Sequence, residues 1–336
     1  MGLKSIIVKS KVLSFVVFRM LHLKNHKYKD LIERRISADL FDYKTIAQPL
    51  PNSYDEICPD NNCFGIGYCI RNYCGLKISH INAFVEHGYF FGQYVSDQET
   101  KSFAKVILTF GDIRKKHIES RINKKAVPIG PYIHYAPDYL SPEQYAQKKK
   151  ELGRVLLVFF SHSGTGCSVE FDVDYIISKI ESIRDDFDTV VISLFWSDIK
   201  EEITAKLEEM GYRVFSAGHR YDYQFLSRVK TMISLADVTM SNCISTHIAY
   251  CSYLKKPHWF VDQDIIAKAE TKKAKDNIRI GTQITNDPVA IVERDEIASA
   301  FKLYSKELTD EQRLVCEKYF GFNYIRRPDE LSEIIK

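Results

Sequence analysis

Residues 154–166 read RVLLVFFSHSGTG, and they are the best indication of the fold class. Val155–Phe160 is an unbroken apolar run, which is typical of a strand buried on both faces of a parallel sheet. The small polar residues of Ser161–Gly166 predict a loop at the carboxyl end of that strand. Short apolar runs then alternate with amphipathic stretches, which predicts a parallel sheet with helical crossovers. The strands expected after this one are 189–195, 212–215, 238–240 and 258–261, and the helices are 172–183, 203–210, 225–233 and 246–254.

The first half of the chain follows the same alternation less regularly. Strands are expected at 81–85, 106–110 and 126–129, and a helix is expected over 112–122. The prolines and lysines of 132–150 are typical of a domain boundary. The sequence therefore predicts an α/β protein with two Rossmann-like domains facing a cleft. Residues 1–145 would form the N-terminal domain, and residues 146–336 would form the C-terminal domain together with the C-terminal helices.

The overall composition excludes several classes of protein. The chain has 336 residues, of which 45% are hydrophobic and 27% charged, so it is neither disordered nor a collagen-like repeat. A formal net charge of +3 provides no global field that would attract DNA or RNA. Its 8 cysteines are too dilute for a disulfide-stapled scaffold, so we expect reduced thiols and a cytoplasmic location.

The N-terminal segment combines apolar and basic residues. Val12–Leu21 is apolar but contains Arg19, and it falls short of the roughly 20 residues that a membrane span needs. Two interpretations stay open: a buried first strand or helix with a solvated basic rim, or a helix lying peripherally on the inner face of the cytoplasmic membrane. The cations around this stretch are Lys4, Lys9, Lys11, Arg19, Lys24, Lys27 and Lys29.

The most informative segment for binding runs from Ala236 to His247. A strand is expected to end at Met240 and a helix to begin near Ser245, so the unpaired N–H groups of that helix would face the carboxyl ends of the strands. Such a helix start can bind a phosphate, and ordinary helix capping is the alternative. The candidate ligand-binding residues here are Ser241, Asn242, Ser245, Thr246 and His247.

A second candidate loop follows the strand quoted first. Its residues Ser161, Ser163, Gly164 and Thr165 could approach the same ligand, because glycine lets the backbone come close. The loop has neither the Walker A spacing nor Gly-x-Gly-x-x-Gly, so it does not indicate an ATPase or a dinucleotide enzyme.

The first domain offers a candidate base at Glu86-His87-Gly88, where a strand gives way to a loop. A histidine near a carboxylate can act as a general base, which typically contributes about 10²–10⁴-fold in rate. A histidine with a purely structural hydrogen bond is the alternative.

Metal-binding patterns are weak. The spacing of Cys58, Cys63, Cys69 and Cys74 lacks the close C-x2-C pairs of a zinc ribbon, and residues 65–70 resemble a helix started by glycine. Asp172 and Asp174 open a predicted helix, where acidic residues are expected as caps. We therefore expect neither a metal nor a cofactor.

Four segments together resemble bacterial surface-polysaccharide glycosyltransferases of the GT-B fold, which include the Kdo-transferring capsule proteins, polysialyltransferases and CDP-glycerol glycerophosphotransferases. The resemblance is carried mainly by residues 80–262, in Glu86-His87-Gly88, Phe110-Gly111, Ile129–Tyr132 and Ala236–Pro257. It implies His87 or Glu86 as the catalytic base, and Ser245-Thr246 as a nucleotide-binding pair. His219 lies nearest to the His-Pro pair of the sialyltransferase-like members, although Arg220 follows it instead of proline.

The resemblance implies an inverting, metal-independent transfer of a sugar from a nucleotide-activated donor. The acceptor would be a hydroxyl of a growing capsule, O-antigen or lipopolysaccharide glycan, which can be lipid-linked. Two alternatives remain: a nucleotide-sugar 2-epimerase of the same fold, and a non-catalytic glycan- or nucleotide-binding protein.

Overall fold

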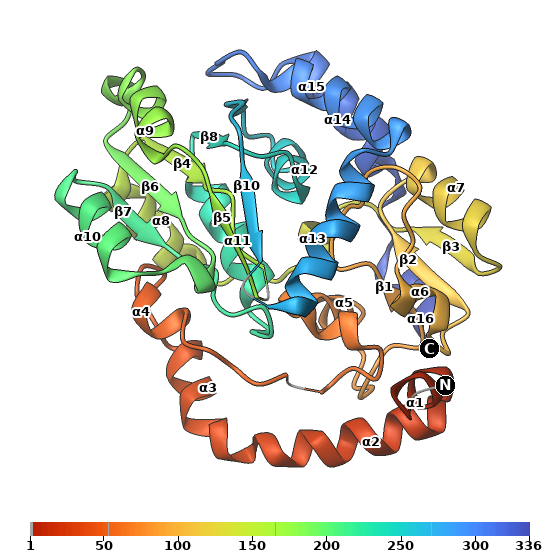
Figure 1. Ribbon diagram of the computed structural model, residues 1–336. Helices are drawn as coiled ribbons and strands as arrows, with labels where there is room; N and C mark the ends of the chain where they lie inside the picture. The colour runs from red at the N-terminus through yellow and green to blue at the C-terminus, as the bar shows by residue number, and fades with distance from the viewer. Residues whose placement is uncertain (1–2, 53, 165, 270) are drawn as a thin grey trace.

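The computed structural model describes residues 3–52, 54–164, 166–269 and 271–336, and it contains two parallel sheets in the body of the protein (Figure 1). The first sheet has the order β1-β2-β3. Phe84 of β1 pairs with Ile107 of β2, which pairs with Ala126 of β3. These strands are β1 (Phe84–Val85), β2 (Val106–Thr109) and β3 (Lys125–Pro128), and α7 (Asp112–Arg121) connects the last two.

The second sheet is larger and confirms the predicted parallel order. Its strands lie in the order β7-β6-β4-β8-β9. The apolar run quoted first forms the central strand β4, in which Val158 pairs with Ile192 on one side and with Met240 on the other. Burial on both faces explains why this strand is apolar throughout. The strands are β4 (Val155–Phe159), β6 (Thr189–Ser193), β7 (Arg213–Phe215), β8 (Val238–Ser241) and β9 (His258–Phe260).

Helices cross over between these strands where the apolar periodicity predicts them. Asp172 caps the first of them by accepting a hydrogen bond from the Tyr175 N–H, so its acidic start serves the helix. The same half of the chain also contains a two-stranded antiparallel sheet, in which β5 (Cys167–Glu170) pairs with β10 (Ile266–Ala269). The crossover helices are α9 (Val173–Glu181), α10 (Glu201–Glu209), α11 (Phe225–Leu235) and α12 (Thr246–Tyr253). Helix α13 (Lys272–Thr285), which was not predicted, follows β10.

The C-terminal helices return to the first sheet, although the sequence grouped them with the second domain. They are α14 (Pro288–Phe301), α15 (Asp310–Phe320) and α16 (Pro328–Ile335). The Ile335 carbonyl accepts a hydrogen bond from the Asn82 N–H, and the Arg326 side chain donates to the Pro128 carbonyl. The last residues therefore stabilise the first domain, and the boundary near residue 145 stays a prediction.

The N-terminal helices lie along the outside of the body (Figure 1). They are α1 (Leu3–Lys9), α2 (Lys11–Leu23), α3 (Lys29–Ile36) and α4 (Tyr43–Ile46). The expectation of a buried first element is wrong for α2, because Val12 is 72% exposed and Met20 is 64% exposed. None of the helices in the described ranges has the length and hydropathy of a membrane-spanning segment.

The remaining elements connect these parts. They are η1 (Lys24–Tyr28), η2 (Pro59–Gly65), α5 (Ile66–Tyr73), α6 (Asp97–Lys101), η3 (Tyr132–Tyr135), α8 (Pro142–Leu152), η4 (Arg184–Asp186), η5 (Trp196–Asp198) and η6 (Phe322–Tyr324).

Candidate functional site

One pocket takes residues from both halves of the molecule. His87, just after β1, lines it from the first half, and Ser245 and Thr246, at the start of α12, line it from the second. The pocket encloses about 940 Å³, including its open mouth. The two sites inferred separately from the sequence are therefore brought together.

His87 is held by a carboxylate that no pattern in the sequence indicates. Its Nδ1 lies 3.0 Å from Asp60 Oδ2, and the His87 side chain is 37% exposed. An ionised carboxylate can only accept a hydrogen bond, so a neutral His87 ring carries its proton on Nδ1 and keeps a lone pair on Nε2. This is the arrangement that a general base requires.

A tight contact positions the segment that supplies Asp60. Gly65 ends η2 with φ +69°, and a Cβ at this position would lie 2.1 Å from the Tyr223 carbonyl oxygen. The N–H of the preceding residue, Phe64, donates to the Arg220 carbonyl at 2.6 Å. A side chain at position 65 would therefore force η2, and Asp60 with it, away from the loop that precedes α11.

Glu86, the other candidate base, is in a different environment. It is 1% exposed and accepts hydrogen bonds from Arg114, with the guanidinium Nε at 2.8 Å, and from the Thr109 hydroxyl. The Glu86 carboxylate therefore forms a fully buried ion pair with Arg114. Of the two adjacent candidates, the geometry favours His87 as the base.

The start of α12 is not capped by a side chain. Ser245 occupies the N-cap position, but its hydroxyl lies 2.8 Å from Nδ1 of His247 and caps no backbone N–H. Thr246 accepts a hydrogen bond from the Tyr89 N–H at 3.0 Å, which joins the two halves beside the pocket. The capping interpretation of Ser245 is therefore wrong, and the first-turn amides have no side-chain cap.

The other predicted donor-binding residues organise the loops behind this helix start. Asn242 Oδ1 accepts hydrogen bonds from the N–H of Ser161 at 2.7 Å and from its hydroxyl at 3.0 Å. The Ser163 N–H donates to Asp198 at 2.9 Å, and Gly164 pairs with Cys167.

Ser241 is buried, and its hydroxyl lies 2.9 Å from Nε2 of His258. Thr165 lies outside the described residues. Ligand binding stays a prediction for Ser241 and Thr165. It also stays a prediction for the residues that organise the loops behind α12.

Aromatic rings make up much of the rest of the lining. Phe64, Phe195 and Phe225 approach one another, with ring centroids 4.9–6.5 Å apart. His247 stacks on Phe159 at 4.8 Å, and burial lowers the pKa of His247 to about 3, so this ring is neutral. These rings could not be identified as site residues from the sequence, because phenylalanines in apolar runs are typical of a hydrophobic core.

The lining of this pocket carries no formal charge at neutral pH apart from any protonated histidine. Among the described residues that line it, none is Lys, Arg, Asp or Glu. His162, which the sequence analysis did not propose, also lines it, with its ring 4.6 Å from Phe195. A bound anion would therefore rely on backbone N–H groups and neutral polar side chains.

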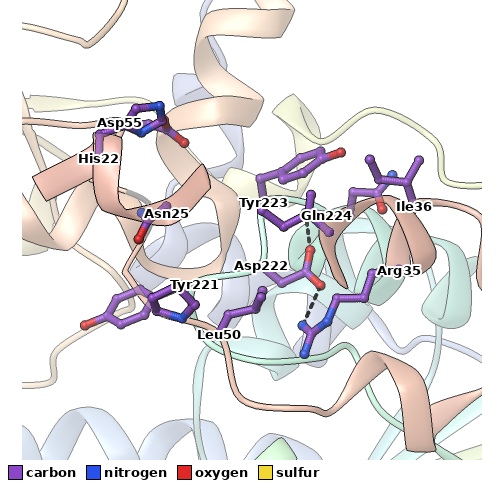
Figure 2. Close-up of a pocket in the computed structure, with 12 residues that line it drawn as sticks. His22, Asn25, Arg35, Ile36, Leu50, Asp55, Tyr221, Asp222, Tyr223 and Gln224 are labelled. Carbon is purple, nitrogen blue, oxygen red and sulfur yellow. Dashed lines mark hydrogen bonds and ion pairs between the residues drawn. The ribbon is translucent and has the colours of Figure 1, made fainter. Parts of the chain in front are cut away.

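His219 is not part of this lining. Its ring contacts Trp196 at 4.3 Å, and burial, followed by the nearby Arg35, lowers the pKa of His219 to about 4. His219 precedes residues 221–224, which line a second pocket. Figure 2 shows that the Asp222 carboxylate in this pocket accepts hydrogen bonds from the Arg35 side chain and from the Gln224 N–H. None of the sequence-predicted site residues lines that second pocket, and a role for His219 in binding stays a prediction.

The four cysteines that are close in sequence, Cys58, Cys63, Cys69 and Cys74, form no disulfide with one another. Cys58 lies 3.7 Å from the Ser102 hydroxyl, and Cys63 accepts a hydrogen bond from Arg220. Burial raises the pKa of Cys69 to about 12. In the part of the chain that the structure describes, no group of three or more His, Cys, Asp or Glu could hold a metal ion.

Neither a protein-family model nor a curated protein matches this sequence. Among solved structures, the chain resembles UGT2 of Phytolacca americana complexed with UDP-2fluoro-glucose and pterostilbene, at 12% identity and a TM-score of 0.29, over 70% of this chain and 51% of that one. It also resembles the GtfA/B complex, at 10% identity and a TM-score of 0.31, over 76% of this chain and 53% of that one. The chain thus spans about half the length of these structures, and similarity this low establishes no family.

Proposed function

We propose that this protein transfers a sugar from a nucleotide-activated donor to a hydroxyl of a glycan. One observation carries the proposal: a carboxylate-supported histidine and an uncapped helix start line the same pocket between two parallel sheets. The histidine is suited to proton abstraction, and the helix start is suited to binding a phosphate. The two sides of the pocket therefore each have one of the two groups that the reaction needs.

In the proposed step, His87 removes the proton of the acceptor hydroxyl while the oxygen attacks the anomeric carbon. The new carbon–oxygen bond forms as the bond to the nucleotide phosphate breaks, the proton stays on His87, and the configuration inverts. Asp60 stabilises the positive ring that results.

The departing phosphate carries the negative charge to the start of α12. The backbone N–H groups and the positive end of the helix dipole there stabilise it, together with the hydroxyls of Ser245 and Thr246. We expect no metal cofactor for this step, and unchanged turnover after treatment with a chelator is the corresponding test.

The proposal includes the finer expectations from the resemblance. The acceptor is a capsule, O-antigen or lipopolysaccharide glycan, free or lipid-linked, and the enzyme acts in the cytoplasm with peripheral contact to the membrane. His219, Ser161, Ser163 and Gly164 would take part in donor binding.

Ligand binding is tested first, with a thermal-shift panel of CMP, CDP, UDP, GDP and ADP. A nucleotide that binds the folded state raises the melting temperature by mass action. No shift with any of them would remove the donor site from the proposal.

Turnover is tested next with the matching nucleotide sugar, with and without glycan acceptors. Release of nucleotide only when an acceptor is present supports transfer. Conversion of the donor alone would indicate the 2-epimerase, and binding without either reaction would indicate a non-catalytic protein.

A further inference from the structure

Helix α2 presents an apolar face to solvent. Val12, Val16, Met20 and Leu23 recur at helical spacing and share one side of the helix, and they are 72%, 48%, 64% and 75% exposed. Ser14 is fully buried on the opposite side. A helix at the surface of a soluble body normally has the reverse arrangement, with its apolar side inward.

The charges that α1 and α2 themselves carry all have one sign, and Asp55 contacts α2 by pairing with His22 at 3.1 Å. No Asp or Glu precedes Asp30 in the sequence, whereas Lys9, Lys11 and Lys27 are exposed around α2. Arg19 lies on α2 itself, with its guanidinium 5.6 Å from the Phe15 ring. An exposed apolar stripe on a segment whose own charges are all positive is complementary to a surface that is apolar inside and anionic at its rim.

We propose that α1 and α2 bind the surface of an anionic lipid bilayer, with the Val12–Leu23 stripe inserted between the headgroups. This specifies the peripheral membrane contact within the proposed function, but its test needs neither donor nor acceptor. The 13 residues of α2 span about 20 Å, against a hydrocarbon core of about 30 Å, so the helix lies along the surface.

A second copy of this chain is a poorer occupant of the face. Pairing two α2 helices through the stripe would bring two sets of lysines together, with no acidic residue before Asp30 to neutralise them. Anionic lipid headgroups supply that neutralisation directly.

The experiment is flotation of the full-length protein with vesicles of phosphatidylcholine alone or mixed with phosphatidylglycerol. We expect binding to the mixed vesicles, weakened by salt, and little to phosphatidylcholine. The double variant Val16→Glu, Met20→Glu should lose at least about tenfold in affinity. Val292→Glu, Leu303→Glu is the matched control, because these apolar side chains are 64% and 73% exposed on and just after α14.

Equal binding to both vesicle types, or unchanged binding by the α2 variant, would overturn the proposal. So would a lipid-free dimer that disappears in the α2 variant while wild-type protein ignores vesicles. Because the substituted residues are exposed, thermal unfolding should match that of the wild type, which verifies that the variant is folded. Loss of vesicle binding with intact nucleotide release in solution would separate this surface from the active site.

Discussion

The two walls of the pocket are built in different ways. The first wall positions one ring, His87, through a carboxylate from another element and keeps the adjacent Glu86 buried with Arg114. In the second wall the Ser245 hydroxyl contacts His247, and behind the wall Asn242 accepts a hydrogen bond from Ser161. The first-turn amides of α12 have no side-chain cap. In the proposed reaction, the first wall would therefore act through a side chain and the second through its backbone.

Replacement of His87 by Ala should have the largest effect on the reaction. We expect turnover to fall by about 10²–10⁴-fold, because the general base is lost, while donor affinity is unchanged. Steady-state kinetics together with nucleotide titration measure the two quantities. His162→Ala is the matched control, since His162 lines the same pocket without a carboxylate partner among its described contacts. Similar losses in both variants would contradict the assignment.

Glu86→Gln should affect folding more than chemistry. Removing the charge leaves the buried Arg114 guanidinium without its main ionic partner, which should lower the free energy of unfolding by about 3 kcal/mol. Urea denaturation measures this change, and turnover per folded molecule should stay close to that of the wild type. A large loss of turnover in folded protein would restore Glu86 as the base.

Asp60→Asn tests how the carboxylate of the first wall supports His87. The amide can donate or accept, so it no longer fixes the proton of His87 on Nδ1, and turnover should fall by about ten- to a hundredfold. Ring nitrogen NMR shifts of His87 should change from one tautomer to a mixture. A fall in turnover with an unchanged tautomer would mean that Asp60 supports the fold alone.

Thr246→Val should have the smallest effect. It removes the acceptor of the Tyr89 N–H and one hydroxyl beside the helix start, each worth about 1 kcal/mol, so donor affinity should drop about fivefold with a small fall in melting temperature. Isothermal titration with the nucleotide measures the affinity. Thr246→Ser keeps the hydroxyl and should retain wild-type binding, and an equal loss in both variants would point to the methyl group instead.

Much of the scaffold could be predicted from local pattern. The run 155–160 and its counterparts became the strands of the second sheet, and the polar loops that follow β4 and β8 lie together at their carboxyl ends, where Asn242 bonds Ser161. Asp60 could not be predicted, because it lies 27 positions before His87 and no spacing rule joins them. The pairing depends on Gly65 fitting against the Tyr223 backbone, which is a tertiary contact.

Periodicity and turn chemistry are local properties, so the residues alone predict the α/β class, the parallel order and the two strand ends that carry polar groups. Which of two adjacent residues is exposed in the pocket depends on what packs over each side chain, and this is a property of the tertiary structure. It placed Arg114 against Glu86 and left His87 37% exposed. It also turned the stripe of α2 outward, a choice that the periodicity of the helix leaves open because both of its sides are apolar.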